Sequence, residues 1–460
     1  MSGLDALTRE ELIETVLRQQ QEIDELRAEV DMLRSQLCGK TGGSGAAPFI
    51  KPNRKERRRQ EKEARKKRSQ SFVRRRDIPT EEVRHAVEVC PDCKRKLSGG
   101  WEHARRQIIE IPDTPIKIID HVLIARRCGV CGKVHIPKLG AADGVIGKMR
   151  LGVRLMSLIA TLSVSSRMPY RTIGRLLESV YGVHISCGQI AEVLHRVADC
   201  AEGEVESILR DIRGSPYANA DETGWREDGI NGYLWSLSTP AARFLYFAKS
   251  RASWVVERLL GYCFGGALVC DFYAAYNWYS GPIQRCWVHF LRDLKKLVEA
   301  HPGDGSVLEW VEQVVGIYKV AKKVAKRPFP EEVRVRLRQE LETRIYAVAE
   351  PYLGKKDAPQ RVLAERIDRH LGELFTFVQY PGCPSGNNAA ERAIRPAVIA
   401  RKISGGTRSD RGSQTRTKLM SVFGTWQLQG KDIFHTCIDM IVASASQPAV
   451  SQCVSSTHQV

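Results

Sequence analysis

The chain has 460 residues and a formal charge of +18. A chain of this length is too long for one hydrophobic core, so two or more domains are expected. The basic excess favours a polyanionic partner, of which nucleic acid is the commonest. No apolar run approaches the roughly 20 residues of a membrane span, and the N-terminus lacks the pattern of a signal peptide, so no membrane partner is expected. The 13 cysteines, an odd number without an export signal, indicate reduced thiols and a cytoplasmic protein.

Residues 1–39 carry a heptad pattern. From Leu12 to Leu37, apolar residues alternate spacings of four and three, with mostly Val or Ile at position a and mostly Leu at position d. This pattern favours a parallel two-stranded coiled coil, and therefore a homodimer or a higher oligomer. Gln19 interrupts the d positions and would fix the register. The alternative is an amphipathic helix that packs on its own chain.

Residues 40–80 are expected to form a flexible basic linker. A Gly- and Ser-rich run over residues 40–48 is followed by residues 51–76, which contain 14 Lys or Arg against three Glu, a net charge of +11. Such a segment repels itself and has little to bury, so it does not fold alone. On DNA it would bind without sequence preference and with strong salt dependence, because each neutralised phosphate releases counterions. A solvated linker without a binding role is the alternative.

Residues 81–140 contain two C-x-x-C motifs and predict a zinc-ribbon-like domain. Between the motifs, residues 107–111 and 117–124 have the composition of strands. Four thiolates from two tight turns are typical of a closed, tetrahedral, structural Zn²⁺ site with one ion. A redox pair is the less favoured alternative, since two such motifs in a reduced compartment indicate metal. The expected ligands are Cys90, Cys93, Cys128 and Cys131.

Residues 141–205 are expected to form a helical DNA-binding domain. The run Tyr170–Tyr181 has helical spacing and ends at Gly182, and Ser186 would cap a second helix. A helix, a short turn containing glycine and a second capped helix are typical of the helix-turn-helix motif, whose second helix reads DNA. Any helical hairpin shares this pattern, so a packing role is the alternative. The candidate DNA-binding residues of the second helix are Gln189 and Arg196.

Residues 206–289 predict a sheet with an acid at each of two strand ends. In chain order we expect a strand closed by Asp221, a hairpin over 233–238 and 243–248, a helix over 253–260, a strand over 267–270 closed by Asp271, and a strand over 284–288. This order of elements is that of a ribonuclease-H-like core.

The segment between Asp271 and Glu391 is too long for a strand and a linking turn. Residues 290–385 carry helical apolar repeats and predict an all-helical insertion, in a position that would let it cover one side of the site. The core is expected to resume over residues 386–445, with Glu391 one turn into a helix and further helices after it. Residues 446–460 are expected to be a disordered tail.

Three carboxylates are therefore candidates for catalysis and for Mg²⁺ binding: Asp221, Asp271 and Glu391. Two acids at strand ends and one on a helix can converge, and hard oxygen ligands suit a pair of Mg²⁺ ions, with Mn²⁺ as a substitute. Such a pair clamps the attacking and leaving oxygens of a phosphoryl displacement. The structural alternatives are a turn residue for Asp221, a helix N-cap for Asp271, and for Glu391 the acidic partner of a capping box begun by Asn388.

Four motifs resemble the transposases of the IS66 family of bacterial insertion sequences. They are Asp221-Glu-Thr-Gly-Trp225, Asp271-x-Tyr-x-Ala-Tyr276, Cys286-Trp-Val-His289-x-x-Arg292-Asp293 and Asn387-Asn-x-x-Glu391-Arg-x-Ile-Arg-Pro396-x-x-x-x-Arg401-Lys402. The resemblance implies a multidomain α+β DDE transposase with a ribonuclease-H-like catalytic core, acting on the ends of its own element. It implies catalytic roles for the three carboxylates. The family usually encodes two small accessory proteins, which are therefore candidate partners.

Residues around the acids complete the predicted site. In many DDE transposases a C-x-x-H pair follows the fifth strand, so Cys286 and His289, with Arg292, would support the site or contact the scissile strand. Core packing is the alternative for the Cys-His pair. Four basic residues near Glu391 would face DNA phosphates, and cations so close would also stabilise the ionised acids. They are Arg392, Arg395, Arg401 and Lys402.

The expected function is metal-dependent DNA strand cleavage and strand transfer at the ends of an insertion sequence, in the nucleoid of a bacterial cytoplasm. One rival is a catalytically inactive, transposase-derived, zinc-containing DNA-binding regulator. A second rival is a ribonuclease-H-like nuclease without strand transfer. Cleavage of end DNA separates the first rival from the enzyme, and joining of a 3′ end to target DNA separates the second.

Overall fold

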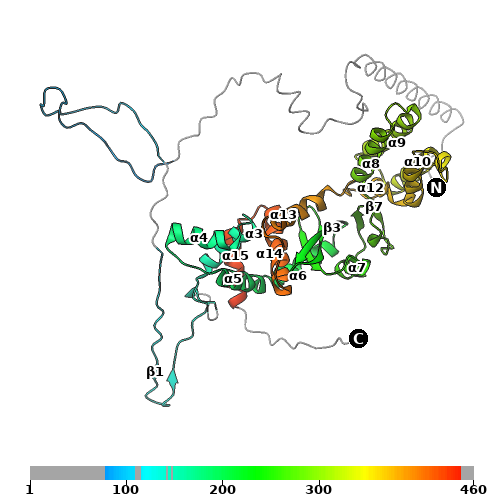
Figure 1. The fold of residues 1–460 in the computed structure, drawn as a ribbon. Helices are drawn as coiled ribbons and strands as arrows, with labels where there is room; N and C mark the ends of the chain where they lie inside the picture. The colour runs from blue at the N-terminus through cyan, green and yellow to red at the C-terminus, as the bar shows by residue number, and fades with distance from the viewer. Residues whose placement is uncertain (1–77, 109–115, 141–142, 147–148, 447–460) are drawn as a thin grey trace, which may run out of the picture. The chain divides into compact units, whose positions relative to one another are not determined.

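The computed structural model describes residues 78–108, 116–140, 143–146 and 149–446 (Figure 1). Of these, residues 204–408 form one compact unit, and those within 78–203 and 409–446 belong to a second. The predicted coiled coil of residues 1–39, the basic arm of residues 51–76 and the tail after Ser446 lie outside the described residues. Within the described ranges, every helix is too short or too polar to cross a lipid bilayer.

The unit of residues 204–408 is built on a five-stranded mixed sheet. Its strands are β3 (Tyr217–Glu227), β4 (Ile230–Ser238), β5 (Arg243–Ala248), β6 (Ala267–Cys270) and β7 (Ile283–Arg285). They lie in the order β5-β4-β3-β6-β7, with β3, β4 and β5 antiparallel and with β6 and β7 parallel to β3. The predicted hairpin, the helix α7 (Ser253–Leu260) and the buried strand before Asp271 are confirmed.

Strand β3 continues past the acid that was expected to close it. Its pairing with β6 ends at Asn219, but its pairing with β4 continues from Asn219 to Glu227. Asp221 therefore lies within the strand, just beyond the point where β3 loses one of its two neighbours. This half-paired stretch of β3 is contacted by helix α13 (Asn388–Ser404).

The last strand is shorter than expected. Strand β7 ends at Arg285, and helix α8 begins at Trp287, so the prediction of a strand over residues 284–288 is wrong in its second half. Trp287, Phe290 and Leu294 are all fully buried, and their spacing of three and four residues is helical. His289 therefore lies in the first turn of a helix and not at the end of a strand.

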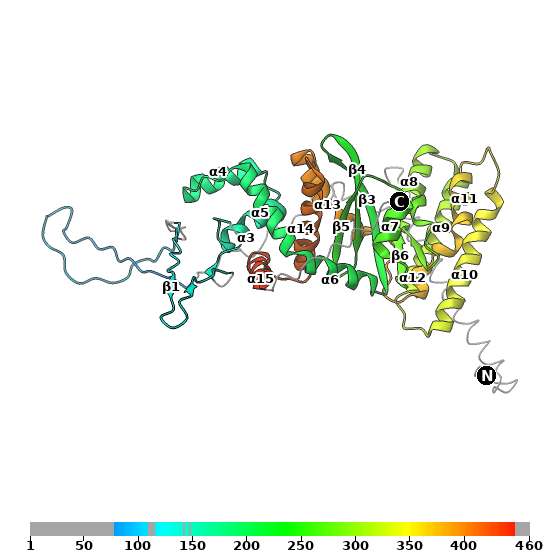
Figure 2. The same ribbon diagram turned by 90° about the horizontal axis from the view of Figure 1, so that it is seen from below.

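The segment after β7 is helical, as expected. It comprises α8 (Trp287–Ala300), α9 (Gly305–Val324), α10 (Glu331–Ala349), α11 (Arg361–Arg369) and α12 (Thr376–Gln379), with the 3-10 turns η3 (Glu350–Tyr352) and η4 (Leu371–Glu373). These helices gather on the β6–β7 side of the sheet (Figure 2). Ala267 and Val269 of β6 belong to the same hydrophobic core as the buried residues of α8 to α12. The insertion and the sheet therefore share one core.

Helix α13 returns the chain to the end of β3. It ends at Gly405, which has a left-handed backbone, and Gly406 follows with φ +113°. A Cβ at Gly406 would meet the Arg226 carbonyl oxygen at 2.1 Å, so only glycine allows this approach. Beyond it, Thr407 accepts a hydrogen bond from the Asp228 amide and donates its own to the Arg226 carbonyl. The C-terminal end of the Glu391 helix is thus tied to the end of β3.

The second unit is mainly helical. Its helices are α3 (Val153–Val164), α4 (Tyr170–Tyr181), α5 (Cys187–Cys200), α14 (Asp410–Leu428) and α15 (Ile433–Ser446); α6 (Glu202–Arg213) then leads into the first unit. As expected, α4 ends at Gly182 in a left-handed conformation, and Ser186 forms a capping box at the start of α5. The expected strand over residues 117–124 is wrong: the described strands nearby are β1 (Arg126–Arg127) and β2 (Val134–His135).

Because the insertion shares the core of the sheet, a change at Trp287 should destabilise the whole first unit. Trp287 is fully buried, stacks on Tyr318 with ring centroids 4.4 Å apart, and donates to the Leu374 carbonyl oxygen at 2.6 Å. Trp287→Ala should cost about 3–5 kcal/mol and increase hydrogen–deuterium exchange in both the sheet and helices α8 to α12. Trp254→Ala, at a half-exposed tryptophan of α7, is the control. Increased exchange confined to the helices would contradict a shared core.

Candidate active site

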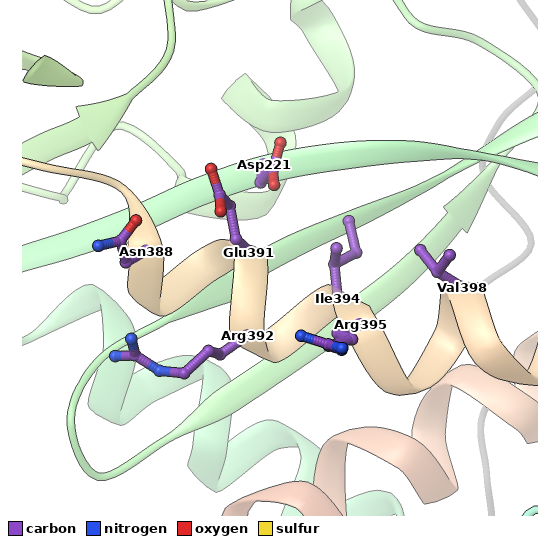
Figure 3. Close-up of a pocket in the computed structure, with 7 residues that line it drawn as sticks. All are labelled: Asp221, Asn388, Glu391, Arg392, Ile394, Arg395 and Val398. Atoms are coloured by element: carbon purple, nitrogen blue, oxygen red, sulfur yellow. The ribbon is translucent and has the colours of Figure 1, made fainter. Parts of the chain in front are cut away.

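Asp221 and Glu391 line one pocket between β3 and α13. Figure 3 shows the two carboxylates on facing elements, and the pocket is also lined by Asn388, Arg392, Ile394, Arg395 and Val398. Glu391 lies one turn into α13, as predicted. Its carboxylate accepts from Arg292 Nη2 at 3.3 Å and lies 3.8 Å from His289 Nε2. The N-cap of α13 is Asn387 and has no side-chain capping bond, so the capping-box alternative for Glu391 is not observed.

Asp271 lies directly after β6, and its carboxylate closes a turn. Its Oδ1 accepts the backbone N–H of Tyr273 at 2.9 Å, ahead of the 3-10 turn η2 (Ala274–Tyr276). This contact is the local hydrogen bond that aspartate commonly makes at a turn, and it leaves the other carboxylate oxygen for another role. Asp221 is held similarly, with Oδ1 accepting the Glu222 N–H at 3.0 Å.

The three carboxylates interact through their charge. Burial, together with the negative charges of Glu222, Asp271 and Glu391, raises the pKa of Asp221 to about 7. The expectation that nearby cations would stabilise the ionised acids is therefore wrong for Asp221, because burial and like charges dominate there. Across the described ranges, no three His, Cys, Asp or Glu side chains lie close enough together to hold a metal ion as they stand.

Glu222 is held on the opposite face of β3 by two partners. Arg251 Nη2 donates to its Oε1 at 2.6 Å, and the Tyr276 hydroxyl donates to its Oε2 at 2.5 Å. The side chain of Glu222 is only 3% exposed. These contacts join β3 to the turn that follows Asp271. Arg251 also lies over the Tyr273 ring, 3.9 Å from its centroid. Sequence reasoning missed Arg251, because it lies in a connecting segment without any motif.

Arg285 holds the backbone at Asp271 from the neighbouring strand. Its side chain is fully buried, its Nη1 donates to the Asp271 carbonyl oxygen at 2.8 Å, and its Nη2 donates to Asn277 Oδ1 at 2.6 Å. Glu373 from the helical insertion compensates the charge, accepting from Arg285 Nε at 2.5 Å and contacting His370 Nδ1 at 2.8 Å. An arginine within a buried strand was the sequence signal that could have identified this contact.

Cys286 and His289 lie at the start of α8, next to the acids. Cys286 is fully buried and its sulfur accepts the backbone N–H of Asn387 at 3.0 Å. Burial raises the pKa of the thiol, but contacts with His289 and Asn387 outweigh it and hold the pKa below the ordinary value. The contact with Cys286 in turn raises the pKa of His289. Cys286 therefore packs in the core, whereas the partly exposed His289 lies beside Glu391.

The basic residues predicted to face DNA fall into two groups. Arg392 and Arg395 are exposed and line the pocket, and Lys402 is exposed near the end of α13. Arg401 instead donates to the Gly224 carbonyl oxygen, which ties α13 to β3.

In the second unit, Gln189 Oε1 accepts the Ser186 N–H within the capping box, and Arg196 Nε lies 3.5 Å from Glu192.

The two C-x-x-C motifs form turns of the same design. In each turn, the backbone carbonyl oxygen of the first cysteine accepts the N–H of the residue four positions later. The backbone N–H of the same cysteine donates to the carbonyl oxygen of the residue five positions later. Lys94 and Gly132, at the fourth position after each first cysteine, both have a positive φ near 60–66°. Hydrogen bonds from the backbone amides three and two residues later, and from the second thiol, lower the pKa of Cys90 and of Cys128. The structure forms the turns separately and does not bring the four cysteines together.

The chain is similar to a family of transposases over more than half of its length. A family model described as the transposase IS66 family matches residues 148–415. This span is more than half of the chain, and the chain belongs to the IS66 transposase family. The uncharacterized protein y4jO of Sinorhizobium fredii (strain NBRC 101917 / NGR234) is 31% identical over 150 residues, which are 33% of this chain and 45% of that protein. The chain thus matches less than half the length of this relative.

The raised pKa of Asp221 predicts how stability depends on pH. Between about pH 4 and pH 7 the folded protein keeps a proton that the unfolded chain has released, so stability falls as pH rises through this window. In chelator at pH 8, Asp221→Asn should therefore stabilise the first unit, by about 1–4 kcal/mol. Thermal unfolding from pH 4.5 to 8.5, compared with the wild type, measures this.

The control for this experiment is Asp228→Asn. Asp228 is exposed in the turn after β3, with φ +49°, a conformation that asparagine also adopts. This variant should follow the wild-type pH profile. An Asp221→Asn protein no more stable than the wild type at pH 8 would contradict the raised pKa of Asp221 and the burial and like charges that cause it.

Proposed function

We propose that the chain is a DDE transposase that cleaves DNA at the ends of its insertion sequence and transfers the strands, with Asp221, Asp271 and Glu391 as the catalytic acids. The observation that carries the proposal is the shared pocket of Asp221 and Glu391, with Asp271 near enough to raise the pKa of Asp221. The strand order β5-β4-β3-β6-β7, with acids on β3 and after β6, supports a ribonuclease-H-like core. Membership of the IS66 transposase family supports the same function.

The acids have the chemistry that suits divalent magnesium. All three offer carboxylate oxygens, which Mg²⁺ and Mn²⁺ prefer. Burial and the nearby carboxylates raise the pKa of Asp221, and a bound cation would favour the ionised form of this acid. Asp221, Asp271 and Glu391 would hold two such ions, and bound ions supply activation of the attacking oxygen and neutralisation of developing charge.

Other side chains would orient the acids and the DNA. Arg292 and His289 lie against the Glu391 carboxylate and limit its movement. Arg392 and Arg395 are exposed at the pocket, where guanidinium groups would bind the phosphates beside the scissile bond. Arg401 would act indirectly, by fixing α13 to β3 at Gly224. Lys402, Gln189 and Arg196 remain candidate DNA contacts on exposed or helical surfaces.

The remaining parts of the chain would bind DNA and assemble the protein. The basic arm would supply salt-sensitive affinity, the α4–α5 pair would act as a helix-turn-helix, and the coiled coil would form a dimer or higher oligomer. The matching turns at Cys90–Cys93 and Cys128–Cys131 support one structural Zn²⁺ bound by all four thiolates. We further propose a bacterial, nucleoid-associated protein that works with accessory proteins of the same element.

Neutral replacements of the three acids test the proposal. Asp221→Asn, Asp271→Asn and Glu391→Gln keep the side-chain size but remove charges that Mg²⁺ requires. Each should abolish cleavage and strand transfer on DNA that carries the ends of the element, with losses of at least ~10²-fold. End binding, measured by fluorescence anisotropy, should persist within about twofold, since it depends on other parts of the chain.

The choice of control follows from the structure. Glu222→Gln is unsuitable, because Glu222 is a buried partner of Arg251 and Tyr276. Asp228→Asn makes the same chemical change just beyond the end of β3 and should retain full activity. Cleavage by Asp221→Asn in Mg²⁺ would show that the acid is wrongly chosen. A wild type that binds ends but never cleaves them would favour the DNA-binding regulator, and one that cleaves without joining 3′ ends would favour the nuclease.

The paired cysteine turns predict a metal content. Protein purified without chelators should contain about one Zn²⁺ per chain by elemental analysis. Cys93→Ser and Cys131→Ser should each lose the metal and expose the region around residues 90–135 to proteolysis. Cys263→Ser, at an exposed cysteine of the first unit, should keep both metal and protease resistance. Wild-type protein without zinc would overturn this assignment.

A further inference from the structure

Residues 385–387 end the segment that connects the long helical insertion to the helix that carries Glu391. We propose that Asn387 is a positioning residue, which fixes α13 against the strand of Asp221 and so sets the separation of the two carboxylates. The inference rests on the proposed function, in which both carboxylates act together. It is carried by the contacts of this one side chain with two separate elements.

The Asn387 side chain is bound to β3 immediately before Asp221. Its Nδ2 donates to the Ala220 carbonyl oxygen at 2.6 Å, and its Oδ1 accepts from Asn219 Nδ2 at 3.0 Å. Asn387 is 1% exposed and Asn219 is fully buried. Pairing between β3 and β6 ends at Asn219. The side-chain amide of Asn387 therefore gives the Ala220 carbonyl oxygen a hydrogen-bond partner where β6 no longer pairs with β3.

The Asn387 backbone is bound to the other two elements of the site. Its N–H donates to Cys286 Sγ at 3.0 Å, at the start of α8. Its carbonyl oxygen accepts the N–H of Glu391 at 3.2 Å, which is the first helical hydrogen bond of α13. One residue therefore links the strand of Asp221, the helix of His289 and Arg292, and the helix of Glu391.

The two preceding residues are held as firmly. Ser385 accepts the Trp287 N–H at 2.9 Å, and its hydroxyl lies 3.0 Å from the Tyr318 hydroxyl. At Gly386 an added Cβ would lie 2.9 Å from Val288 Cγ2, closer than real Cβ atoms approach. The end of the insertion is therefore fixed to α8 and α9 before the chain enters α13. Asn387 is the last of these contacts and the one that reaches Asp221.

Only an amide of this size makes both side-chain contacts. The Ala220 carbonyl needs a donor, and Asn219 Nδ2 needs an acceptor. Aspartate would lose the donor and direct a negative charge at a carbonyl oxygen, whereas alanine would lose both contacts. Because buried polar groups are costly to leave unpaired, either change should shift α13 relative to β3. A displacement of about 1 Å at reacting groups can lower a rate by about 10²-fold.

The test compares Asn387→Ala and Asn387→Asp with Thr376→Val in the full-length protein. Thr376 is fully buried and its hydroxyl donates to the Ile283 carbonyl oxygen at 2.5 Å, so the control also loses a buried hydrogen bond in the same unit. We would measure single-turnover cleavage of end DNA, its dissociation constant, and the rise in melting temperature caused by MnCl2 alone. Wild type and Asp221→Asn are measured alongside.

For both Asn387 variants we expect cleavage to fall at least ~10-fold, DNA binding to stay within about twofold, and the Mn²⁺-induced melting shift to fall to the level of Asp221→Asn. Thr376→Val should keep the wild-type rate and shift. Asn387 variants with wild-type rates and shifts, or a Thr376→Val protein with equal losses, would overturn the positioning role. A wild type that never cleaves but shows the Mn²⁺ shift, with that shift lost in the Asn387 variants and in Asp221→Asn and kept in Thr376→Val, would overturn the proposed function and support this inference.

Discussion

The first unit holds the partly buried carboxylate of Asp221 close to other negative charges, although burial and like charge both disfavour its ionised form. Burial, followed by the negative charges of Glu222, Asp271 and Glu391, raises the pKa of Asp221 to about 7. Repelling groups stay together only where the backbone that carries them is fixed by stronger contacts. Glu391 is paired with Arg292, whereas Asp221 and Asp271 accept backbone N–H groups of neighbouring residues. Divalent cations bound by these acids, as proposed, would neutralise the repulsion between them.

Buried polar contacts fix the backbone that carries the acids. Glu222 joins β3 to the turn after Asp271, Arg285 holds the carbonyl of Asp271, and Asn387 bridges β3 and α13. Each of these groups is largely or fully buried and hydrogen-bonded to more than one partner. In a low-dielectric interior such satisfied networks favour one arrangement strongly, because any other leaves polar groups unpaired.

The helical insertion belongs to this framework. Glu373 compensates the buried charge of Arg285, and Tyr318 contacts Ser385 just before α13. The insertion also shares its hydrophobic core with β6. A segment anchored in this way cannot swing away as a separate lid without exposing core residues and unpairing Arg285. The insertion lies between Asp271 and Glu391 in the chain. Its contacts with Arg285 and Ser385 help to fix the segments that carry these two acids.

The sequence by itself determined the periodic elements: the hairpin of β4 and β5, helix α7, strand β6 and the helical insertion. These depend on local apolar spacing and local caps, which the chain order contains. Only the tertiary structure decided where β3 and β7 end, because a strand ends where its partners end. Likewise, the pKa of Asp221 and the engagement of Arg401 and Asn387 depend on residues distant in sequence. The strength of charge interactions and hydrogen bonds depends on the distances between atoms, and the fold, not the order of residues, sets those distances.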